Sequence, residues 1–348
     1  MGAGGGRHER LCPNGDQLRK YRNWLPQWLL PKLNDFIFDC MVKYALEQGY
    51  FKGKVDLLID DTAEWYYGKD RFPLNPAITG GHNGPGTSRK RNYFACLLKV
   101  GKFYLYCGVV QLEKGASEVP HVERVIDRLA ALGVEVRVVM GDRWFPTFDL
   151  LDALRARDIP YLGPYKRYPN IKKLILKFLH GGTKYIFSHE VWGAPATRKG
   201  RPPVEVTLIL TNPRGRRLSE IQEDCMSGAK SEADCLKEIM VMVTTAKPPR
   251  SKKARQRWAV RLCQRYHVRW QIETIFRDVK RMVPASNART NGRKLLMFSA
   301  RFWGFNLWQL ACAEWRRQKQ HAKSHRRGPT LRSFAHDLEM AALEVSAL

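Results

Sequence analysis

Short apolar runs separated by glycines and polar turns mark the first half of the chain. Their length and their bounding residues are typical of buried strands. Five such runs are predicted as strands: 55–60, 92–100, 102–112, 134–142 and 159–166. The segments 122–133 and 145–159 have helical periodicity instead. The resulting order of strands and helices predicts an α/β fold, with a mixed sheet flanked by helices.

The pattern changes on either side of this region. Residues 16–50 indicate two helices broken near Pro31, because proline interrupts a helix interior. Beyond residue 166, strand-like runs at 184–191, 204–211 and 238–246 alternate with basic turns. We interpret residues 166–250 as a β-strand-rich insertion. The very basic segment that follows, KPPRSKKARQR, is expected to be a linker.

The next segment, YHVRWQIETIFRDVK at 266–280, combines an apolar stripe with an unusual polar one. At 100° per residue, Tyr266, Arg269, Glu273 and Lys280 fall at about 0°, −60°, −20° and −40° around a helix axis. A solvated helix face usually mixes its polar residues without order. An acid, two bases and a phenol on one narrow stripe instead indicate a binding or catalytic site.

The net charge changes the range of possible partners. The 348 residues carry a formal charge of +27. Solubility alone is one explanation, but a polyanion is a better one, because Lys and Arg displace counterions from phosphates. A membrane surface is a weaker alternative. The run at 295–313 is interrupted by Arg301, Asn306 and Gln309, which predicts a buried core helix rather than a membrane span.

Two other classes of protein fit poorly. The glycine-rich stretch at 80–91 lacks the Lys-Ser/Thr ending of a P-loop, so we expect no nucleotide cofactor. The eight cysteines form no CxxC pair and no zinc-finger spacing. Cys96, Cys107 and Cys312 lie in apolar runs and are expected to be core residues of a cytoplasmic protein.

Carboxylates stand at the ends of two predicted strands. Asp60 and Asp61 end the first, Asp142 ends a later one, and Glu273 lies on the polar stripe. A single Asp at a strand end is often a turn or cap residue. Three acids held by two strands and a helix can instead bind divalent cations, because Mg²⁺ prefers oxygen ligands. Two ions about 4 Å apart would support a displacement at phosphorus.

At this point the chain resembles DDE transposases of the IS4 type, including the archaeal ISH3-like group. The resemblance is carried by IDDT at 59–62, GDRWF at 141–145 and the Tyr-x2-Arg-x3-Glu-x6-Lys signature that begins at Tyr266. Together these motifs span about residues 55 to 312. The resemblance implies an RNase H-like core with a β-rich insertion between the second catalytic Asp and the catalytic Glu.

The resemblance also implies roles for single residues. Asp61, Asp142 and Glu273 would bind two Mg²⁺ ions, for which Mn²⁺ could substitute. Asp61 is preferred to Asp60 because the ligand in this family directly precedes the Thr. Strand alternation cannot separate the two, since both faces of a buried strand are apolar. Further residues are expected to contact DNA phosphates: Tyr266, Arg269, Lys280, Arg143, and Arg89, Lys90 and Arg91 on a predicted loop.

The function implied is cut-and-paste transposition: Mg-dependent cleavage and transfer of DNA strands in a prokaryotic cell. The partners would be double-stranded DNA, as element ends and target, and a second copy of the chain in a synaptic complex. An endonuclease that does not join strands and an inactive DNA-binding relic remain alternatives. The expected divisions are 1–50 (helical, DNA-binding), 51–165 (first part of the core), 166–250 (insertion), 251–320 (second part of the core) and 321–348 (basic tail).

Overall fold

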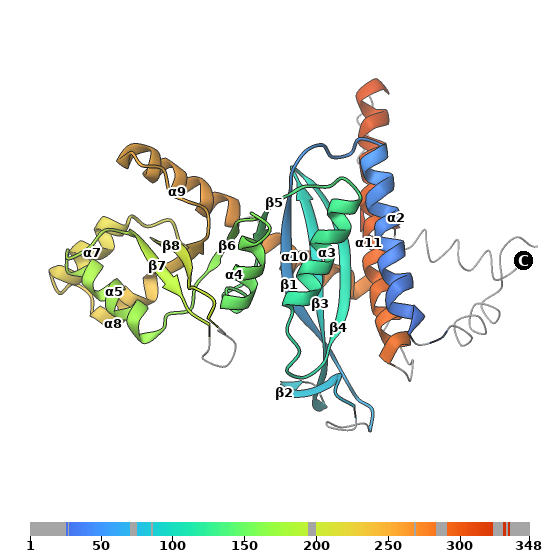
Figure 1. The fold of residues 1–348 in the computed structure, drawn as a ribbon, viewed down its shortest axis with the longest axis horizontal. Helices are drawn as coiled ribbons and strands as arrows, with labels where there is room; N and C mark the ends of the chain where they lie inside the picture. Colours follow the sequence, from blue (N-terminus) through green and yellow to red (C-terminus); the bar gives the residue numbers. More distant parts are fainter. Residues whose placement is uncertain are drawn as a thin grey trace, which may run out of the picture.

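A computed structural model describes residues 26, 28–69, 75–84, 86–193, 200–267, 269–282, 291–322, 330, 331, 333 and 334. Within these residues, nine strands form one mixed sheet (Figure 1). Eight of them follow the order β2-β3-β1-β5-β6-β9-β8-β7, and β4 pairs with β3. The predicted α/β class with helices on both sides of a mixed sheet is therefore confirmed.

The first five runs build the centre of the sheet, as β1 (Val55–Trp65), β3 (Thr87–Val100), β4 (Phe103–Leu112), β5 (Val136–Met140) and β6 (Tyr161–Pro164). A further strand, β2 (Ile78–Gly84), was not predicted and pairs with β3. β3 is antiparallel to β1 and β4, whereas β5 is parallel to β1 and β6 is parallel to β5. The order β4-β3-β1-β5-β6 is an RNase H-like core, as the resemblance implies.

The strands of the predicted insertion continue this same sheet. They are β7 (Ile186–Val191), β8 (Val204–Thr211) and β9 (Met240–Thr244). β9 lies antiparallel to β6, with Gly163 opposite Val243, and β8 and β7 follow outward. Three helices belong to the same region: α5 (Pro169–Leu179), α7 (Leu218–Met226) and α8 (Glu232–Glu238). The insertion is thus a mixed α/β extension of the core sheet.

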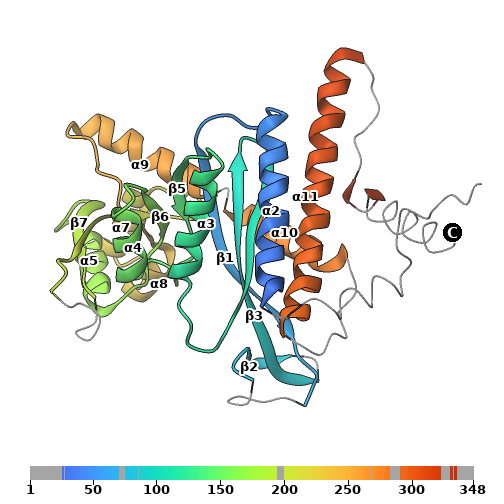
Figure 2. The ribbon, with the colours of Figure 1, turned by 45° about the vertical axis from the view of Figure 1, so that its right-hand side comes forward.

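Helices cover both faces of the sheet, because its strands are apolar on both sides. The remaining helices are α2 (Leu29–Glu47), α3 (Val119–Ala131), α4 (Phe148–Arg155), α9 (Lys252–His267), α10 (Trp270–Met282) and α11 (Asn291–Ala322). α3 and α4 pack on the face that contains Leu57 and Ile59. α9, α10 and α11 pack on the opposite face, which contains Leu58. α2 and α11 run side by side along β4 (Figures 1 and 2).

Two buried asparagines satisfy backbone groups of β4. Asn306 on α11 donates a hydrogen bond to the carbonyl of Tyr106 and accepts one from its amide, both at 2.8 Å. Asn34 on α2 donates to the carbonyl of Val109 at 2.8 Å. Buried backbone groups need such partners. The long helix α11 carries buried Phe302, and no described helix is long and apolar enough to span a membrane.

α2 begins at Leu29 with Pro31 in its first turn, where a missing backbone N–H is tolerated. Most of the helix expected ahead of Pro31 lies outside the described residues. Two other sequence-based expectations are wrong in detail. The supposed basic linker is helical from Lys252 onward. The predicted helix over 266–280 is two helices, because Arg269 lies in a turn between them. The backbone amide of Arg269 donates a hydrogen bond to the carbonyl of Tyr266 at 2.8 Å.

Candidate active site

Two adjacent parallel strands, β1 and β5, bring the first acids together at their carboxyl ends. Leu58 on β1 is paired with Met140 on β5, so Asp60 and Asp142 each lie two residues beyond a paired position. The loop after β5 is tightly packed: a Cβ on Gly141 would lie 2.9 Å from the Phe145 ring. Because the backbone at Gly141 packs against Phe145, the next residue, Asp142, is held at the end of β5.

Asp60 and Asp61 lie on different sides of the sheet. Successive side chains of a strand alternate between its faces. Asp60 shares the face of Leu58, where α10 packs, and is buried at 8% exposure. Asp61 is exposed, and its backbone amide donates to Oδ1 of Asp60 at 3.0 Å.

A buried arginine links Asp60 to the polar stripe. Nη1 of Arg269 lies 3.4 Å from Oδ2 of Asp60, and its Nη2 donates to Oε1 of Glu273 at 2.6 Å. Its Nε donates to the phenol oxygen of Tyr266, also at 2.6 Å. The Arg269 side chain is only 5% exposed. The turn between α9 and α10 therefore brings three of the four stripe residues into contact.

Burial dominates the ionisation of Asp60. It raises the pKa of this carboxyl to about 7, against the opposing effect of Arg269 and with further increases from Asp61 and Glu273. Burial alone would lower the pKa of Arg269, but the interactions with Tyr266, Asp60 and Glu273 raise it. The guanidinium remains charged, whereas Asp60 can accept a proton near neutral pH.

A cleft of about 850 Å³ opens beside this network. Its lining is Asp142, Arg143, Trp144, Pro164, Tyr165, Lys166, Arg167, Pro213, Met240, Val241, Tyr266, Arg269 and Glu273. Two acids and several cations thus share one cavity. Five of the lining residues (Asp142, Arg143, Tyr266, Arg269 and Glu273) were candidates from sequence.

The sequence did not single out the two basic residues Lys166 and Arg167 in the wall of the cleft. Lys166 and Arg167 follow β6, and burial and repulsion by Arg143 lower the pKa values of both. The ammonium of Lys166 lies 3.7 Å from the ring centroid of Trp144, which is 63% exposed. A basic pair directly after a buried strand was the signal that could have indicated them.

The predicted basic loop is not a loop. Residues 88–91 belong to β3, because β2 and β3 form a hairpin through Gly84 and Thr87. Arg91 is 1% exposed and donates to Oδ1 of Asn291 at 2.6 Å, so its guanidinium faces the interior. Arg89 and Lys90 are half-buried. The side chain of Lys280 lies outside the described part of the structure.

The acids do not converge as a metal centre in this arrangement. Across the described ranges, no three acidic, histidine or cysteine side chains are placed to bind one ion. The physical reason is Arg269, which contacts both Asp60 and Glu273. The oxygen ligands have the right chemistry for a divalent cation, but the guanidinium occupies the position between two of them.

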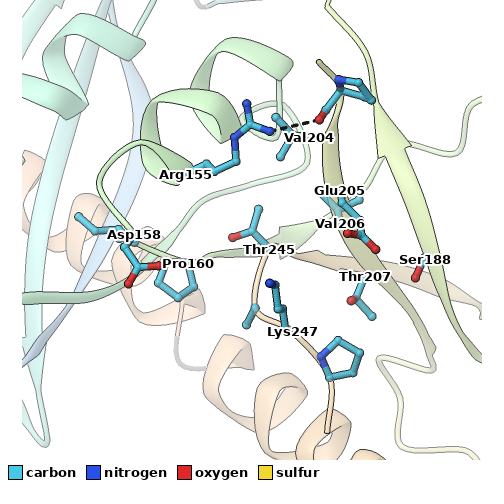
Figure 3. A pocket seen from close by; sticks show the side chains of 14 residues that line it. Arg155, Asp158, Pro160, Ser188, Val204, Glu205, Val206, Thr207, Thr245 and Lys247 are labelled. Atoms are coloured by element: carbon cyan, nitrogen blue, oxygen red, sulfur yellow. Dashed lines mark hydrogen bonds between the residues drawn. The ribbon is translucent and has the colours of Figure 1, made fainter. Parts of the chain in front are cut away.

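A larger cavity of about 1020 Å³ lies elsewhere, between the end of α4, β8 and the segment after β9 (Figure 3). Two of its polar side chains already bind backbone groups of the fold. Arg155 donates to the carbonyl of Pro203 at 3.2 Å, and the Thr245 hydroxyl accepts from the amide of Tyr161 at 2.8 Å. We therefore place the candidate site in the smaller cleft, where the residues expected from sequence meet.

Comparisons with known proteins show the family of the chain. The family model described as a transposase DDE domain matches residues 109–307, more than half of the chain. The match includes Asp142 and Glu273 and begins after β1. No curated protein matches the chain.

Among the solved structures that are similar is a piggyBac transposase synaptic complex with hairpin DNA. The identity is 12% and the TM-score 0.46. The match covers 84% of this chain and 52% of the other, so the chain spans about half the length of that transposase.

Proposed function

The chain belongs to the transposase DDE domain family, and on that premise we propose that it cleaves DNA strands at the ends of a mobile element and transfers them to target DNA. One observation carries the proposal. Asp142 and Glu273 line the same cleft as Arg143, Lys166 and Arg167. Acids beside a basic wall suit a phosphodiester: the cations attract the phosphate, and carboxylates suit chemistry at phosphorus.

The third carboxylate of this proposal is Asp60, in place of Asp61. Asp60 lies on the α10 side of β1 and contacts Arg269, which also holds Glu273. Asp61 points to the other face of the strand, and a one-residue step along a strand reverses the side chain. The set that we propose is therefore Asp60, Asp142 and Glu273.

Members of this family typically use divalent metal ions. We propose Mg²⁺ here, with Mn²⁺ as a substitute and two ions per site, because all the acids offer oxygen ligands. The described side chains do not fit such a centre as they stand, since Arg269 bridges Asp60 and Glu273. When bound, the ions would stabilise charge on phosphate oxygens.

The cleft residues have separate roles in this proposal. Arg143 and Lys166 attract the phosphate near the cut. Burial and repulsion by Arg143 lower the pKa of Lys166, and a phosphate bound between the two cations would offset that repulsion. The exposed ring of Trp144 offers a flat apolar surface to the sugar or base. Tyr266 orients Arg269 through its phenol oxygen. The planar Arg269 guanidinium has the geometry for a bidentate contact with a phosphate.

We propose double-stranded DNA as the partner and a homodimer as the working unit, because two element ends must be held together for joining. Light scattering of the protein with and without DNA tests the dimer. A monomer at every concentration in the presence of element ends would refute it.

The decisive experiment is a cleavage and strand-transfer assay. The substrate is DNA that carries the sequences flanking the coding region, with Mg²⁺ or Mn²⁺ added. Glu273→Gln should abolish cutting, whereas Glu223→Gln, an exposed glutamate on α7 outside the cleft, should not. Cutting without joining would indicate an endonuclease. Binding without cutting under either metal would indicate an inactive relic.

A further inference from the structure

Helix α9 lies at the edge of the molecule in both ribbon views (Figures 1 and 2). One of its faces is packed on the body of the protein: Ala259 and Tyr266 are buried, and Trp258 and Leu262 are half-buried in the same apolar cluster. This face fixes the direction of the helix. It also determines which side chains face solvent.

The opposite face carries a line of cations. Lys253, Arg257 and Arg261 are exposed and follow one another at intervals of four residues. Such neighbours are about 5–6 Å apart, and like charges at this spacing repel. The α9 sequence contains no Asp or Glu. Within the described residues, none of the three forms an ion pair.

Arg265, on the inner side of the same helix, shows the contrast. Its Nε lies 3.8 Å from Oδ2 of the buried Asp56 on β1. The protein therefore supplies an acid where an α9 cation faces inward, and supplies none along the outer stripe. An outer stripe of uncompensated charge requires solvent or an external anion.

We propose that the Lys253–Arg257–Arg261 stripe binds the phosphate backbone of duplex DNA next to the cleavage site. This rests on the proposed function, since it deepens the description of its DNA substrate. Eight residues of helix rise about 12 Å. The same length of duplex carries about seven phosphates, more than enough for three contacts. α9 ends at His267, one residue after Tyr266 of the cleft, so DNA bound to the stripe lies on the helix that leads into the cleft.

The test compares two triple variants by the salt dependence of duplex DNA binding. One is Lys253→Gln/Arg257→Gln/Arg261→Gln. The other is Lys52→Gln/Lys102→Gln/Lys172→Gln, which removes the same charge from exposed positions on other elements. Each lost phosphate contact reduces the steepness of log K against log salt by about 0.9. The slope of the stripe variant should therefore be less negative than that of wild type by about 2.7. Between 50 and 200 mM salt, its affinity should then fall about 40-fold less than that of wild type.

The control variant should keep a slope close to that of wild type. Equal slopes for the two variants would overturn the proposal, because the effect would then come from net charge alone. Arg257→Lys/Arg261→Lys keeps the charges and should retain the slope. The measurement needs binding only. It therefore gives an answer even if the protein never cuts DNA, in which case the proposed function fails separately.

Discussion

Replacing Asp60 by asparagine should stabilise the metal-free protein at alkaline pH. Asparagine resembles the neutral form of the side chain in shape. Arg269 keeps its 2.6 Å contact with Glu273 in the variant, so no buried charge loses its last partner. The substitution therefore isolates the cost of ionising a carboxyl group that burial disfavours.

The magnitude follows from the pKa of Asp60, raised from 3.8 to about 7 by burial. A raised folded-state pKa means that the native protein binds this proton more tightly than the unfolded chain does. Its contribution to stability is complete below pH 3.8 and is lost as the pH rises through 7. At 1.36 kcal/mol per pKa unit, the full loss is about 4 kcal/mol.

The assay is urea unfolding in EDTA from pH 4 to pH 8, comparing wild type, Asp60→Asn and Asp61→Asn. The free energy of unfolding of Asp60→Asn minus that of wild type should increase as the pH rises, and this difference should become constant above pH 7. The exposed Asp61→Asn should follow wild type. A difference for Asp60→Asn that does not change with pH would refute the reasoning. Adding Mg²⁺ at pH 8 should stabilise wild type but not Asp60→Asn if Asp60 is a ligand.

Three further substitutions test the surroundings of the site. Arg269→Gln leaves the buried Asp60 and the exposed Glu273 without their cation and should cost about 3–5 kcal/mol in urea unfolding at pH 8, and less at pH 5. Asn306→Ala leaves the buried amide and carbonyl of Tyr106 on β4 without their side-chain hydrogen bonds. It should cost about 2–4 kcal/mol by the same measurement. Gly141→Ala places a Cβ 2.9 Å from the Phe145 ring and should reduce DNA cleavage more than DNA binding.

The sequence predicted the strands of the core well, because each is a continuous apolar run. It could not show how the insertion joins them. The pairing of Gly163 with Val243 depends on which sheet edge is open after β6, and this is a property of the assembled fold. The helix over 252–257 was likewise not predicted, because this segment is mostly charged and shows no apolar periodicity of its own. The buried residues that anchor the helix, Ala259 and Tyr266, come later in α9.

The polar stripe was identified from sequence, but the break within it was not. Tyr266 and Ile272 both face the core, so the apolar pattern continues across the interruption. The turn is visible only in backbone hydrogen bonds. The amide of Arg269 donates to the carbonyl of Tyr266, and the amide of Ile272 donates to the carbonyl of Arg269. Side-chain periodicity carries no information on such bonds.

The choice between Asp60 and Asp61 shows the same limit. Leu57 and Leu58 are both fully buried, so hydrophobicity does not distinguish the two faces of β1. What distinguishes them is the position of α10, which packs on only one face. The sequence alone left this choice open.

The sheet explains why the cleft depends on the insertion as well as the core. Lys166 and Arg167 follow β6, while Met240 and Val241 of β9 form another part of the wall. β9 is hydrogen-bonded to β6, and the amide of Tyr165 bonds the carbonyl of Val241 at 2.8 Å. The β6–β9 ladder therefore helps to set the distance between Asp142, at the end of β5, and the basic wall. A change in the β6–β9 pairing would move the cations relative to Asp142, even with every site residue still present.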